Sequence, residues 1–261
     1  MNLPGIVARF TERTGGRSES PYTSLNVGLH VGDVDEHVIQ NRERVAEEIG
    51  IPLDRWVAGD QVHGSTVTVV TEDMRGRGAR TLESLLPATD ALITDVPGLA
   101  LTTYAADCAP LLFADPVRRV VGAAHAGWKG TVAKIAGKTV RALVDTYGCD
   151  PADIRVTIGP TIGACCYEVD DRVEREVRAA FAEHEELLES NEKGRWQFDV
   201  PLANEKALLE AGVRPEHIER LDRCTSCCVD RQFSHRREQG RTGRHAGVIA
   251  LLPDCEHAAG K

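Results

Sequence analysis

Short runs of apolar residues, several of them alternating with polar ones, recur along the chain and are separated by glycine, proline and charged residues. Runs of this length are typical of β-strands, and alternation indicates a strand with one buried face. We therefore predict strands at residues 6–11, 66–71, 90–94, 99–104, 111–114, 120–124, 154–158, 196–200, 218–224 and 245–252.

Apolar residues at helical spacing predict four helices between these strands. Gly50 ends the first helix, Asp170 is a candidate N-cap of the third, and Pro201 suits the first turn of the fourth. The predicted segments are 35–49, 127–147, 171–188 and 201–211. The strands are clustered and do not alternate strictly with helices, which favours an α+β fold over a doubly wound sheet. With no linker, repeat or low-complexity tract, we predict a single domain over residues 1–261.

The composition narrows the class of protein. A net charge of −9 argues against nucleic acid or an anionic membrane as the main partner. The first residues, MNLPGIVARF, lack the pattern of a signal peptide, and no stretch reaches the roughly 20 apolar residues of a membrane span. We therefore expect a cytoplasmic protein whose eight cysteines are mostly reduced. Cys149 and Cys255 have no chemical context and are expected to be buried.

The stretch from residue 104 to 130 contains two apolar runs around the turn-like sequence Asp-Pro-Val-Arg. This arrangement predicts a β-hairpin. A loop centred on Pro116 and Val117 would place Cys108 directly opposite His125. Directly opposed side chains have Cβ atoms roughly 4.5–5.5 Å apart, which allows a thiolate and an imidazole to share one metal ion.

His63 and His125 each stand between small residues, in QVHGS and AAHAG, where a ligand can approach a strand end. With Cys108 they suggest a mononuclear site. One thiolate and two imidazoles suit zinc in tetrahedral geometry, and three protein ligands leave one position for water or substrate. The same donors suit copper, but neither Met1 nor Met74 is close in sequence to supply an axial ligand, and no His-x-His pair occurs. Zinc is therefore favoured over copper.

Two cysteine pairs carry a weaker signal. Cys224 and Cys227 form a C-x-x-C motif without a second such motif, and a packed or incidental pair is the expected interpretation. Cys165 and Cys166 follow a glycine- and proline-rich turn, and burial is again expected.

Basic residues near glycine turns are candidate anion sites. Lys129 lies at a predicted helix N-terminus, where backbone N–H groups favour a phosphate. A second cationic patch is predicted from Arg236, Arg237, Arg241 and Arg244. At least half of these charges are expected to be ordinary surface residues in a chain of net charge −9.

A series of motifs occurs in one order along residues 10–250: FTERTGG, PYTSLNVGLHVGD, NRERV, QVHG, DALIT, ADCAPLLFAD, AAHAGWKG, IGPTIGACCYEV and FSHRR. In these motifs the chain resembles the bacterial laccase-domain family. Members of that family are regarded as multifunctional purine nucleoside phosphorylases, and are also described as polyphenol oxidases or peptidoglycan-editing factors. Glu12, Lys129 and Thr161 depart from residues common in the family, and Lys129 keeps a charge but loses the bidentate fork of arginine.

The resemblance implies a four-layer α/β/β/α sandwich with mixed sheets and a zinc ion bound by His63, Cys108 and His125. It also implies phosphorolysis of adenosine, inosine, guanosine and methylthioadenosine, together with adenosine deamination. Our hypothesis is a zinc enzyme with this trio as catalytic and metal-binding residues and with a purine nucleoside and phosphate as substrates. Candidate substrate contacts are Arg13, Asn26, Lys129 and Arg236, and candidate general acids are Asp107 and Cys166.

Three alternatives remain open at the level of the sequence. Cys108 with His125 as base would suit an amidase or hydrolase that acts on a peptidoglycan precursor. A copper polyphenol oxidase would need copper in the same trio. A non-catalytic binding module would use zinc only to stabilise its fold. The sequence predicts no oligomeric state.

Overall fold

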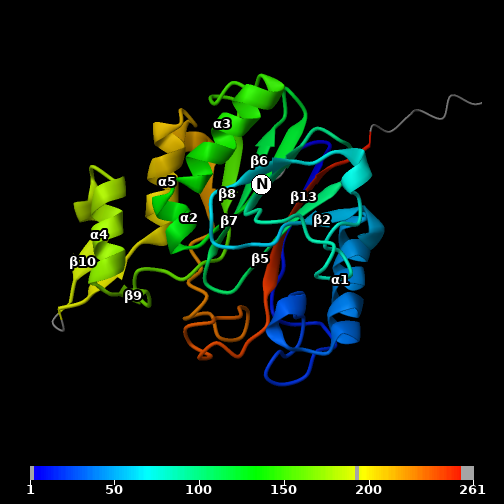
Figure 1. Ribbon diagram of the computed structural model, residues 1–261, viewed down its shortest axis with the longest axis horizontal. Helices are drawn as coiled ribbons and strands as arrows, with labels where there is room; N and C mark the ends of the chain where they lie inside the picture. Colours follow the sequence, from blue (N-terminus) through cyan, green and yellow to red (C-terminus); the bar gives the residue numbers. More distant parts are fainter. Residues whose placement is uncertain (1–2, 192–193, 254–261) are drawn as a thin grey trace, which may run out of the picture.

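Two β-sheets stacked face to face form the centre of the computed structural model, which describes residues 3–191 and 194–253 (Figure 1). The larger sheet has the strand order β12-β8-β6-β7-β4-β3. Its strands are β3 (Val67–Val69), β4 (Ala91–Thr94), β6 (Ala109–Asp115), β7 (Val120–Ala126), β8 (Arg155–Ile158) and β12 (Ile218–Arg220). The pairs β3–β4 and β8–β12 are parallel and the other pairs antiparallel, so the sheet is mixed.

The second sheet has four strands in the order β1-β13-β5-β2. They are β1 (Ile6–Phe10), β2 (Trp56–Ala58), β5 (Ala100–Ala105) and β13 (His245–Leu251). A small third sheet, in the order β10-β11-β9, contains β9 (Glu168–Val169), β10 (Leu188–Ser190) and β11 (Trp196–Phe198). It lies with α4 (Asp171–Ala180) at one side of the molecule (Figure 1).

Helices cover the outer faces of the two large sheets. The α1 helix (Asp35–Ile49) packs on the four-stranded sheet, where Val45 and Ile49 join an apolar cluster with Trp56. On the six-stranded sheet, α3 (Ile135–Tyr147) and α5 (Val200–Glu210) pack through residues such as Val140 and Leu208, beside the short α2 (Trp128–Val132). Short 3-10 helices occur at Leu29–Val31, Leu53–Arg55, Glu72–Met74, His184–Glu186 and Pro215–His217.

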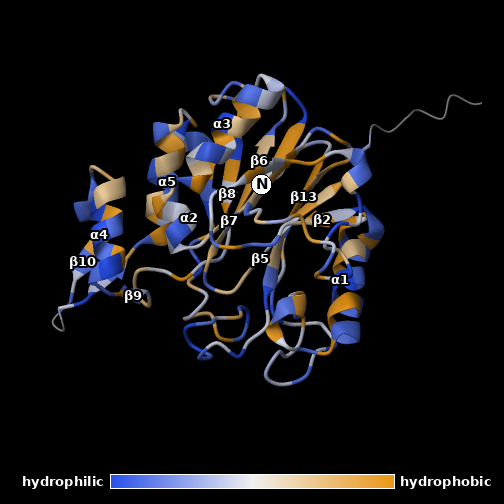
Figure 2. Cartoon of the chain, viewed as in Figure 1, coloured by the Kyte–Doolittle hydropathy of each residue, from blue (hydrophilic) through white to orange (hydrophobic). Residues whose placement is uncertain are grey.

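A third apolar layer lies between the two sheets. Leu101 and Ile249 from the four-stranded sheet meet Leu112 and Val121 from the six-stranded sheet. Removing such side chains from water stabilises the stacked sheets by about 25 cal/mol per Å² of apolar surface. The central strands are accordingly the most hydrophobic part of the chain (Figure 2). The resulting layer order is α/β/β/α, and the α+β prediction is confirmed.

The predicted hairpin forms from β6 and β7, but its register differs from the prediction. His125 lies opposite Pro110, not opposite Cys108. The Asp115 carboxylate accepts hydrogen bonds from the backbone N–H groups of residues 117 and 118, and Arg119 has a left-handed φ of 55°. The loop therefore holds four residues rather than two. Because the shift is two residues, every side chain stays on its predicted face of the sheet.

The prediction of one helix from 127 to 147 is also wrong in one respect, because the segment forms two helices, α2 and α3. Lys134 has φ 55° and ψ 44°, a left-handed conformation that ends the hydrogen-bonding of α2 before α3 begins. The other helix signals are confirmed: α1 ends at Gly50 with φ 73°, and the Asp170 carboxylate accepts hydrogen bonds at the start of α4. The third helix is shorter than predicted, because it ends at Ala180.

Two further expectations concern membrane-spanning helices and the burial of two cysteines. No helix within residues 3–191 and 194–253 combines the length and the apolar content that a membrane span needs. Cys149 is buried, with 3% of its surface exposed, as predicted. Cys255 lies outside the described residues.

Candidate active site

His63, Cys108 and His125 come together at one edge of the stacked sheets. One ligand atom from each lies within 4.8 Å of the other two. His63 lies in the loop between β2 and β3, Cys108 in the turn between β5 and β6, and His125 near the end of β7. The two imidazole rings meet edge to face, with centroids 4.8 Å apart. His125 is buried, Cys108 half-buried and His63 exposed, so the group opens toward solvent.

Asp90 organises this group from directly before β4. Its Oδ1 atom accepts a hydrogen bond from the His63 backbone N–H at 3.0 Å and lies 3.0 Å from His125 Nδ1. Its Oδ2 atom accepts the Gly64 backbone N–H at 2.7 Å. Burial alone would raise the pKa of Asp90, but these hydrogen bonds outweigh burial and lower it. Since Nδ1 of His125 faces the carboxylate, Nε2 is the nitrogen left for a ligand.

Gly127 provides the space that the trio occupies. A Cβ atom at this position would lie 2.7 Å from His63 Cδ2 and 3.1 Å from Cys108 Sγ. The φ of Gly127 is −71°, which any residue can adopt, so it is the lack of a side chain and not backbone freedom that the site requires. The residues present therefore fit one metal ion, with two nitrogen donors and one sulfur.

The trio is also electrostatically coupled. Burial raises the pKa of the Cys108 thiol, but the two imidazoles more than offset burial and lower that pKa to about 6. Burial lowers the pKa of His125, while the Cys108 thiolate and Asp90 raise it to about 9. The lowered pKa favours the thiolate form of Cys108, which is the form that binds metals and acts as a nucleophile.

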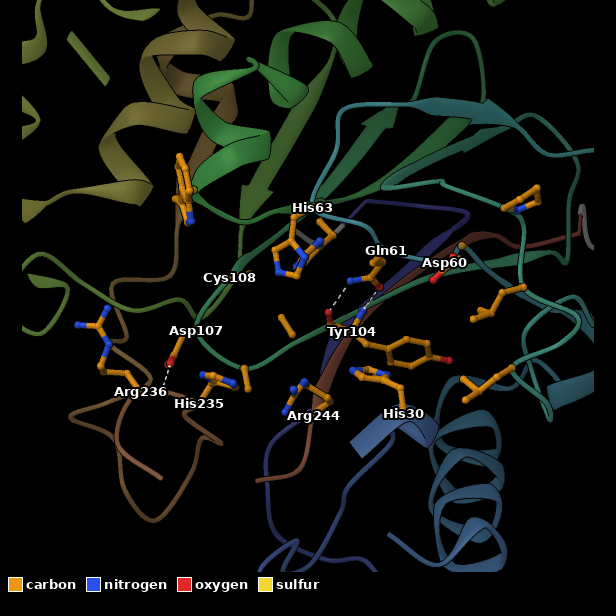
Figure 3. Close-up of a pocket in the computed structure, with 18 of the residues that line it drawn as sticks. His30, Asp60, Gln61, His63, Tyr104, Asp107, Cys108, His235, Arg236 and Arg244 are labelled. Carbon is orange, nitrogen blue, oxygen red and sulfur yellow. Dashed lines mark hydrogen bonds between the residues drawn. The ribbon is translucent and has the colours of Figure 1, made fainter. Parts of the chain in front are cut away.

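A cavity of about 830 Å³ adjoins the trio (Figure 3). Gln61 fixes one wall, because its side-chain amide donates to the Tyr104 carbonyl at 2.7 Å and accepts from the Tyr104 N–H at 2.8 Å. Aromatic side chains of Tyr104, Trp128 and Tyr167 line the cavity together with polar groups. A cavity of this size can enclose a nucleoside-sized molecule.

Basic side chains line the cavity together with the trio. His30 also lines the cavity but adds no charge at neutral pH, because burial and then the nearby charges of Arg244 and Arg42 lower its pKa to about 4. Arg42 is fully buried, donates to the carbonyls of residues 78 and 79, and lies 4.4 Å from the Tyr104 ring centroid. Arg236 and Arg244 also line the cavity. These arginines can attract an anionic ligand group, while Asp60, Glu83 and Asp107 place negative charge elsewhere in the same lining.

The sequence and the structure match a known protein family. A family model described as "Multi-copper polyphenol oxidoreductase laccase" matches residues 7–252. The chain belongs to this family. A relative named "Purine nucleoside phosphorylase YlmD" from Geobacillus stearothermophilus is 45% identical over 246 residues, covering 94% of this chain and 90% of the relative. A Bacillus subtilis protein of the same name is 41% identical, covering 96% and 90% respectively.

Solved structures of the family agree with the fold. The crystal structure of YlmD from Geobacillus stearothermophilus superposes with a TM-score of 0.93 and 43% identity, covering 96% of this chain and 93% of that one. A Bacillus licheniformis structure titled as the hypothetical protein YfiH gives a TM-score of 0.92 and 43% identity, covering 94% and 92%. The four-layer α+β architecture is thus a property that this chain shares with solved members of the family.

Only one of the four predicted substrate contacts lines the described cavity. Arg236 does so, while Arg13 is not among the lining residues and its guanidinium pairs with Glu238 at 2.9 Å. Asn26 is fully buried, and its Oδ1 atom accepts the Arg244 N–H at 2.8 Å, so it supports a lining residue instead of being one. Lys129 is exposed and its Nζ lies 5.8 Å from the Trp128 ring centroid.

The predicted arginine patch is divided between two places. Arg236 and Arg244 line the cavity, whereas Arg237 donates to the backbone carbonyls of residues 225, 226 and 232. Arg241 is exposed. The surface interpretation of these charges therefore holds for Arg241, while Arg237 stabilises a loop.

The candidate general acids have different surroundings. Asp107 lines the cavity, and its two carboxylate oxygens accept from Thr225 Oγ1 at 2.6 Å and from the Arg236 N–H at 2.7 Å. It therefore fixes the loop that carries Arg236. Cys166 faces Cys227, with 3.4 Å between the sulfurs, and is not among the lining residues.

The expectation that Cys165 and Cys166 are buried is wrong, whereas the expectation of a packed or incidental pair at Cys224 and Cys227 is not contradicted. Cys165 and Cys227 are exposed, and Cys166 and Cys224 are half-buried. The pairs pack against each other because the turns after β8 and β12, which are parallel neighbours, end at the same edge of the sheet.

Sequence reasoning did not select Asp90, Gln61, His30 or Arg42 as site residues. Asp90 carries the one recognisable signal, a carboxylate directly before a buried strand in the DALIT motif. Gln61 stands two residues before His63. His30 lies in the 3-10 helix at Leu29–Val31, and Arg42 lies in α1, which packs on the four-stranded sheet. Their contribution depends on the stacking of the two sheets, which no local pattern encodes.

Proposed function

We propose that this protein is a zinc-dependent purine nucleoside phosphorylase of the cytoplasm. The observation that carries the proposal is the trio of His63, Cys108 and His125 at the edge of a large cavity whose lining includes Arg236 and Arg244. The names of the relatives from Geobacillus and Bacillus support the same activity. Adenosine, inosine, guanosine and methylthioadenosine are the proposed nucleosides.

Zinc is the proposed metal because its preferred ligands are imidazole nitrogen and thiolate sulfur in tetrahedral geometry. Among the described residues, three or more ligating side chains converge at this trio and at one cysteine cluster. Met74, the one methionine within residues 3–191 and 194–253, packs in the layer between the sheets. These features do not support a multicopper centre. A bound zinc ion would act as a Lewis acid toward a substrate oxygen or a water molecule.

In phosphorolysis, a phosphate oxygen forms a bond to C1′ of the ribose as the C1′–N9 bond breaks. The products are ribose 1-phosphate and the free purine, which takes up one proton. Arg244 and Arg236, which line the cavity, would hold the phosphate by charge-assisted hydrogen bonds. Tyr104 and Tyr167 offer aromatic faces for the purine. Holding both reactants in one cavity would supply much of the rate enhancement.

Adenosine deamination is proposed as a second reaction of the same cavity. Water adds to C6 of the purine, and ammonia leaves. Both reactions use the same bound nucleoside, but only phosphorolysis consumes phosphate. Ammonia release from adenosine in phosphate-free buffer measures the second reaction, and we expect the His125→Ala substitution to abolish it together with the first.

The test of the phosphorylase proposal is the release of hypoxanthine from inosine with and without phosphate. We expect phosphate-dependent release by the unchanged protein and a loss of more than about 100-fold in His125→Ala, because a metal ligand is removed. His184→Ala is the matched control, since His184 lies on a 3-10 helix remote from the trio in sequence and is not among the cavity-lining residues. Equal rates for the unchanged protein and His125→Ala would overturn the proposal.

A thiol hydrolase is the second candidate, and one arrangement favours it. Asp90 orients His125, which lies beside Cys108, in the order of groups that nucleophilic cysteine enzymes use. The presence of His63 as a third potential ligand favours a metal site instead. Alkylation of Cys108 that abolished hydrolysis of an amide substrate, with the bound zinc unchanged, would support the hydrolase.

A further inference from the structure

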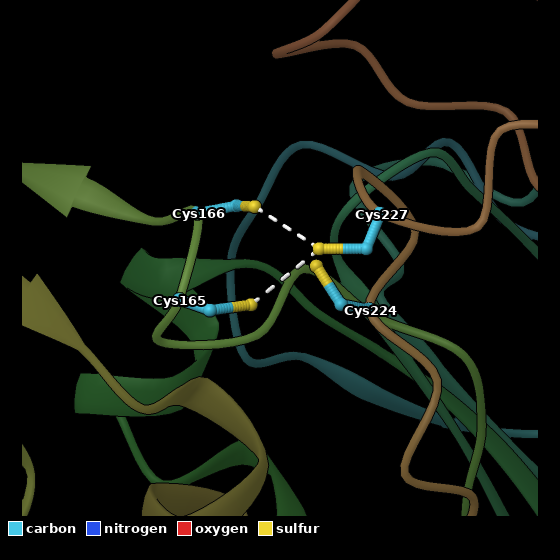
Figure 4. A group of neighbouring side chains, drawn as sticks. All are labelled: Cys165, Cys166, Cys224 and Cys227. Carbon is cyan, nitrogen blue, oxygen red and sulfur yellow. Dashed lines mark hydrogen bonds between the residues drawn. The ribbon is translucent and has the colours of Figure 1, made fainter.

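Four cysteines meet in a second group that the proposed reaction does not use (Figure 4). Cys165 and Cys166 lie in the turn that follows β8, and Cys224 and Cys227 lie in the turn that follows β12. Their sulfur atoms all lie within 4.8 Å of one another. Figure 4 shows the side chains from the two turns pointing toward a common centre.

The spacing of the sulfurs suits a tetrahedral ion. The Cys227 sulfur lies 3.4 Å from that of Cys166 and 3.7 Å from that of Cys165. Four sulfurs at the usual zinc–sulfur distance of about 2.3 Å are about 3.8 Å apart. All four residues are free thiols.

The backbone around Cys224 and Cys227 is folded as a tight turn that presents both sulfurs. The N–H groups of Cys227 and Cys228 both donate to the Cys224 carbonyl, at 3.2 and 2.9 Å. The Gly163 N–H, from the opposite turn, donates to the Cys224 sulfur at 3.3 Å. A backbone donor aimed at a sulfur stabilises the thiolate form that a metal requires.

A positive charge lies against the same turn. Arg237 donates through Nη1 to the carbonyls of Thr225 and Ser226, at 2.7 and 2.9 Å. Four thiolates around one divalent cation carry a net charge of about −2, and the adjacent guanidinium offsets part of it. The two turns thus supply the ligands and a hydrogen-bond donor, and Arg237 supplies a counter-charge from a later segment of the chain.

We propose that Cys165, Cys166, Cys224 and Cys227 form a second metal site, which binds zinc as a closed four-sulfur centre. Binding releases the thiol protons, and the four sulfurs fill the coordination sphere of the ion. Cys165 and Cys227 are exposed, so zinc can enter from solvent. This site is structural and does not depend on the proposed phosphorylase activity.

The ion would fasten together two loops that shape the cavity. Thr161 and Cys224 form an isolated β-bridge between these loops. Thr225, next to Cys224, donates to Asp107, and Tyr167, next to Cys166, lines the cavity. Zinc at the four cysteines therefore holds Asp107 and Tyr167 in position without touching a substrate.

Metal analysis of purified protein, after dialysis against zinc-containing and then zinc-free buffer, tests the proposal. We expect about two zinc ions per chain in the unchanged protein and about one in His125→Ala, which leaves the cysteine site intact. Adding Cys224→Ser and Cys227→Ser to His125→Ala should remove the remaining ion. Cys228→Ser is the matched control and should keep both ions, because Cys228 lies in the same turn but outside the group.

X-ray absorption on zinc-loaded His125→Ala measures the ligands directly, and it needs no cysteine variant to fold. A shell of four sulfur atoms at about 2.3 Å is the expected result. Folded His125→Ala protein without zinc, or with zinc bound by nitrogen and oxygen, would overturn the proposal. Oxidation of two of the four thiols to a disulfide in metal-free protein, with no zinc uptake after reduction, would do the same.

Discussion

At the scale of single residues, the site depends on two positions that bind no ligand themselves. Asp90 holds the His63 and Gly64 backbone and the His125 ring through three contacts, and Gly127 leaves the room in which His63 and Cys108 meet. Both act through His63, Cys108 and His125, the trio proposed to bind the metal. Their substitution should therefore change metal affinity more than fold stability.

Replacement of Asp90 by asparagine keeps the shape of the side chain but removes its charge. We expect zinc affinity at the trio to fall about 10- to 100-fold, the usual cost of losing the partner of a ligating histidine. Competition with a chromophoric chelator measures this zinc affinity. Asp145→Asn is the control, because Asp145 is exposed on α3. Unchanged affinity in Asp90→Asn would show that the carboxylate does not orient His125.

The Gly127→Ala substitution adds one methyl group against His63 and Cys108. We expect loss of the zinc ion at the trio with little change in thermal unfolding, because the backbone conformation suits alanine. Zinc content and a melting curve of the metal-free proteins give the two quantities. Full zinc occupancy in this variant would contradict the packing described for Gly127.

The sequence alone predicts the candidate ligands but not the residues that hold those ligands in position. From the residues alone, His63, Cys108 and His125 give only a weak signal for a metal site, and the resemblance of the motifs to a known family implies the same three ligands. Asp90 was assigned only to a strand. Its role depends on a contact with His125 across 35 positions of sequence, which a local pattern cannot reveal.

At the scale of elements, long periodic segments were predictable and short ones were not. The α1 helix and strands β1 and β13 occur where the pattern placed them. Strands β2, β9 and β10 contain two or three residues each, too few to show a period, and tertiary pairing alone defines them. The break at Lys134 was missed because apolar spacing continues through it.

The N-cap of α4 permits a prediction at this scale. The Asp170 carboxylate accepts from the backbone N–H groups of Arg172 and Val173, both at 3.1 Å. Asp170→Ala should lower the free energy of unfolding by about 1 kcal/mol, measured by urea denaturation. Glu176→Ala, at an exposed mid-helix position, should leave it nearly unchanged. Equal values for the two variants would contradict the capping role.

Strand β13 begins with a fully buried histidine, His245. Because of this residue, the free energy of unfolding of the protein should depend on pH. Burial lowers the pKa of His245 to about 4 from a normal value of 6.5. Between these values the unfolded chain binds more protons than the folded one, so stability is lost as pH falls from 6.5 to 4. His245 alone should lower the free energy of unfolding by about 3 kcal/mol over this pH range.

Urea denaturation of metal-free protein across that pH range, with His245→Gln for comparison, measures this dependence. The unchanged protein should lose more stability than the variant as the pH falls. Profiles that stay parallel from pH 6.5 to 4 would show that His245 does not remain neutral in the folded state.

At the scale of the whole molecule, the site lies where the chain passes between the two stacked sheets. His63 lies between β2 of the four-stranded sheet and β3 of the six-stranded sheet, and Cys108 lies between β5 and β6, which belong to the same two sheets. His125 is on β7 of the six-stranded sheet. The stacking itself thus brings the ligands together. Unfolding would separate the three ligands, whereas removal of a bound metal should leave the apolar layers in place.

The most direct test of the account is a zinc titration of metal-free protein with phosphate-dependent turnover of inosine as the readout. If His63, Cys108 and His125 hold the catalytic ion, turnover should rise with zinc bound at the trio and reach a plateau when that site is full, and His125→Ala should show no rise. Full turnover in metal-free protein, or an equal rise in His125→Ala, would contradict the account.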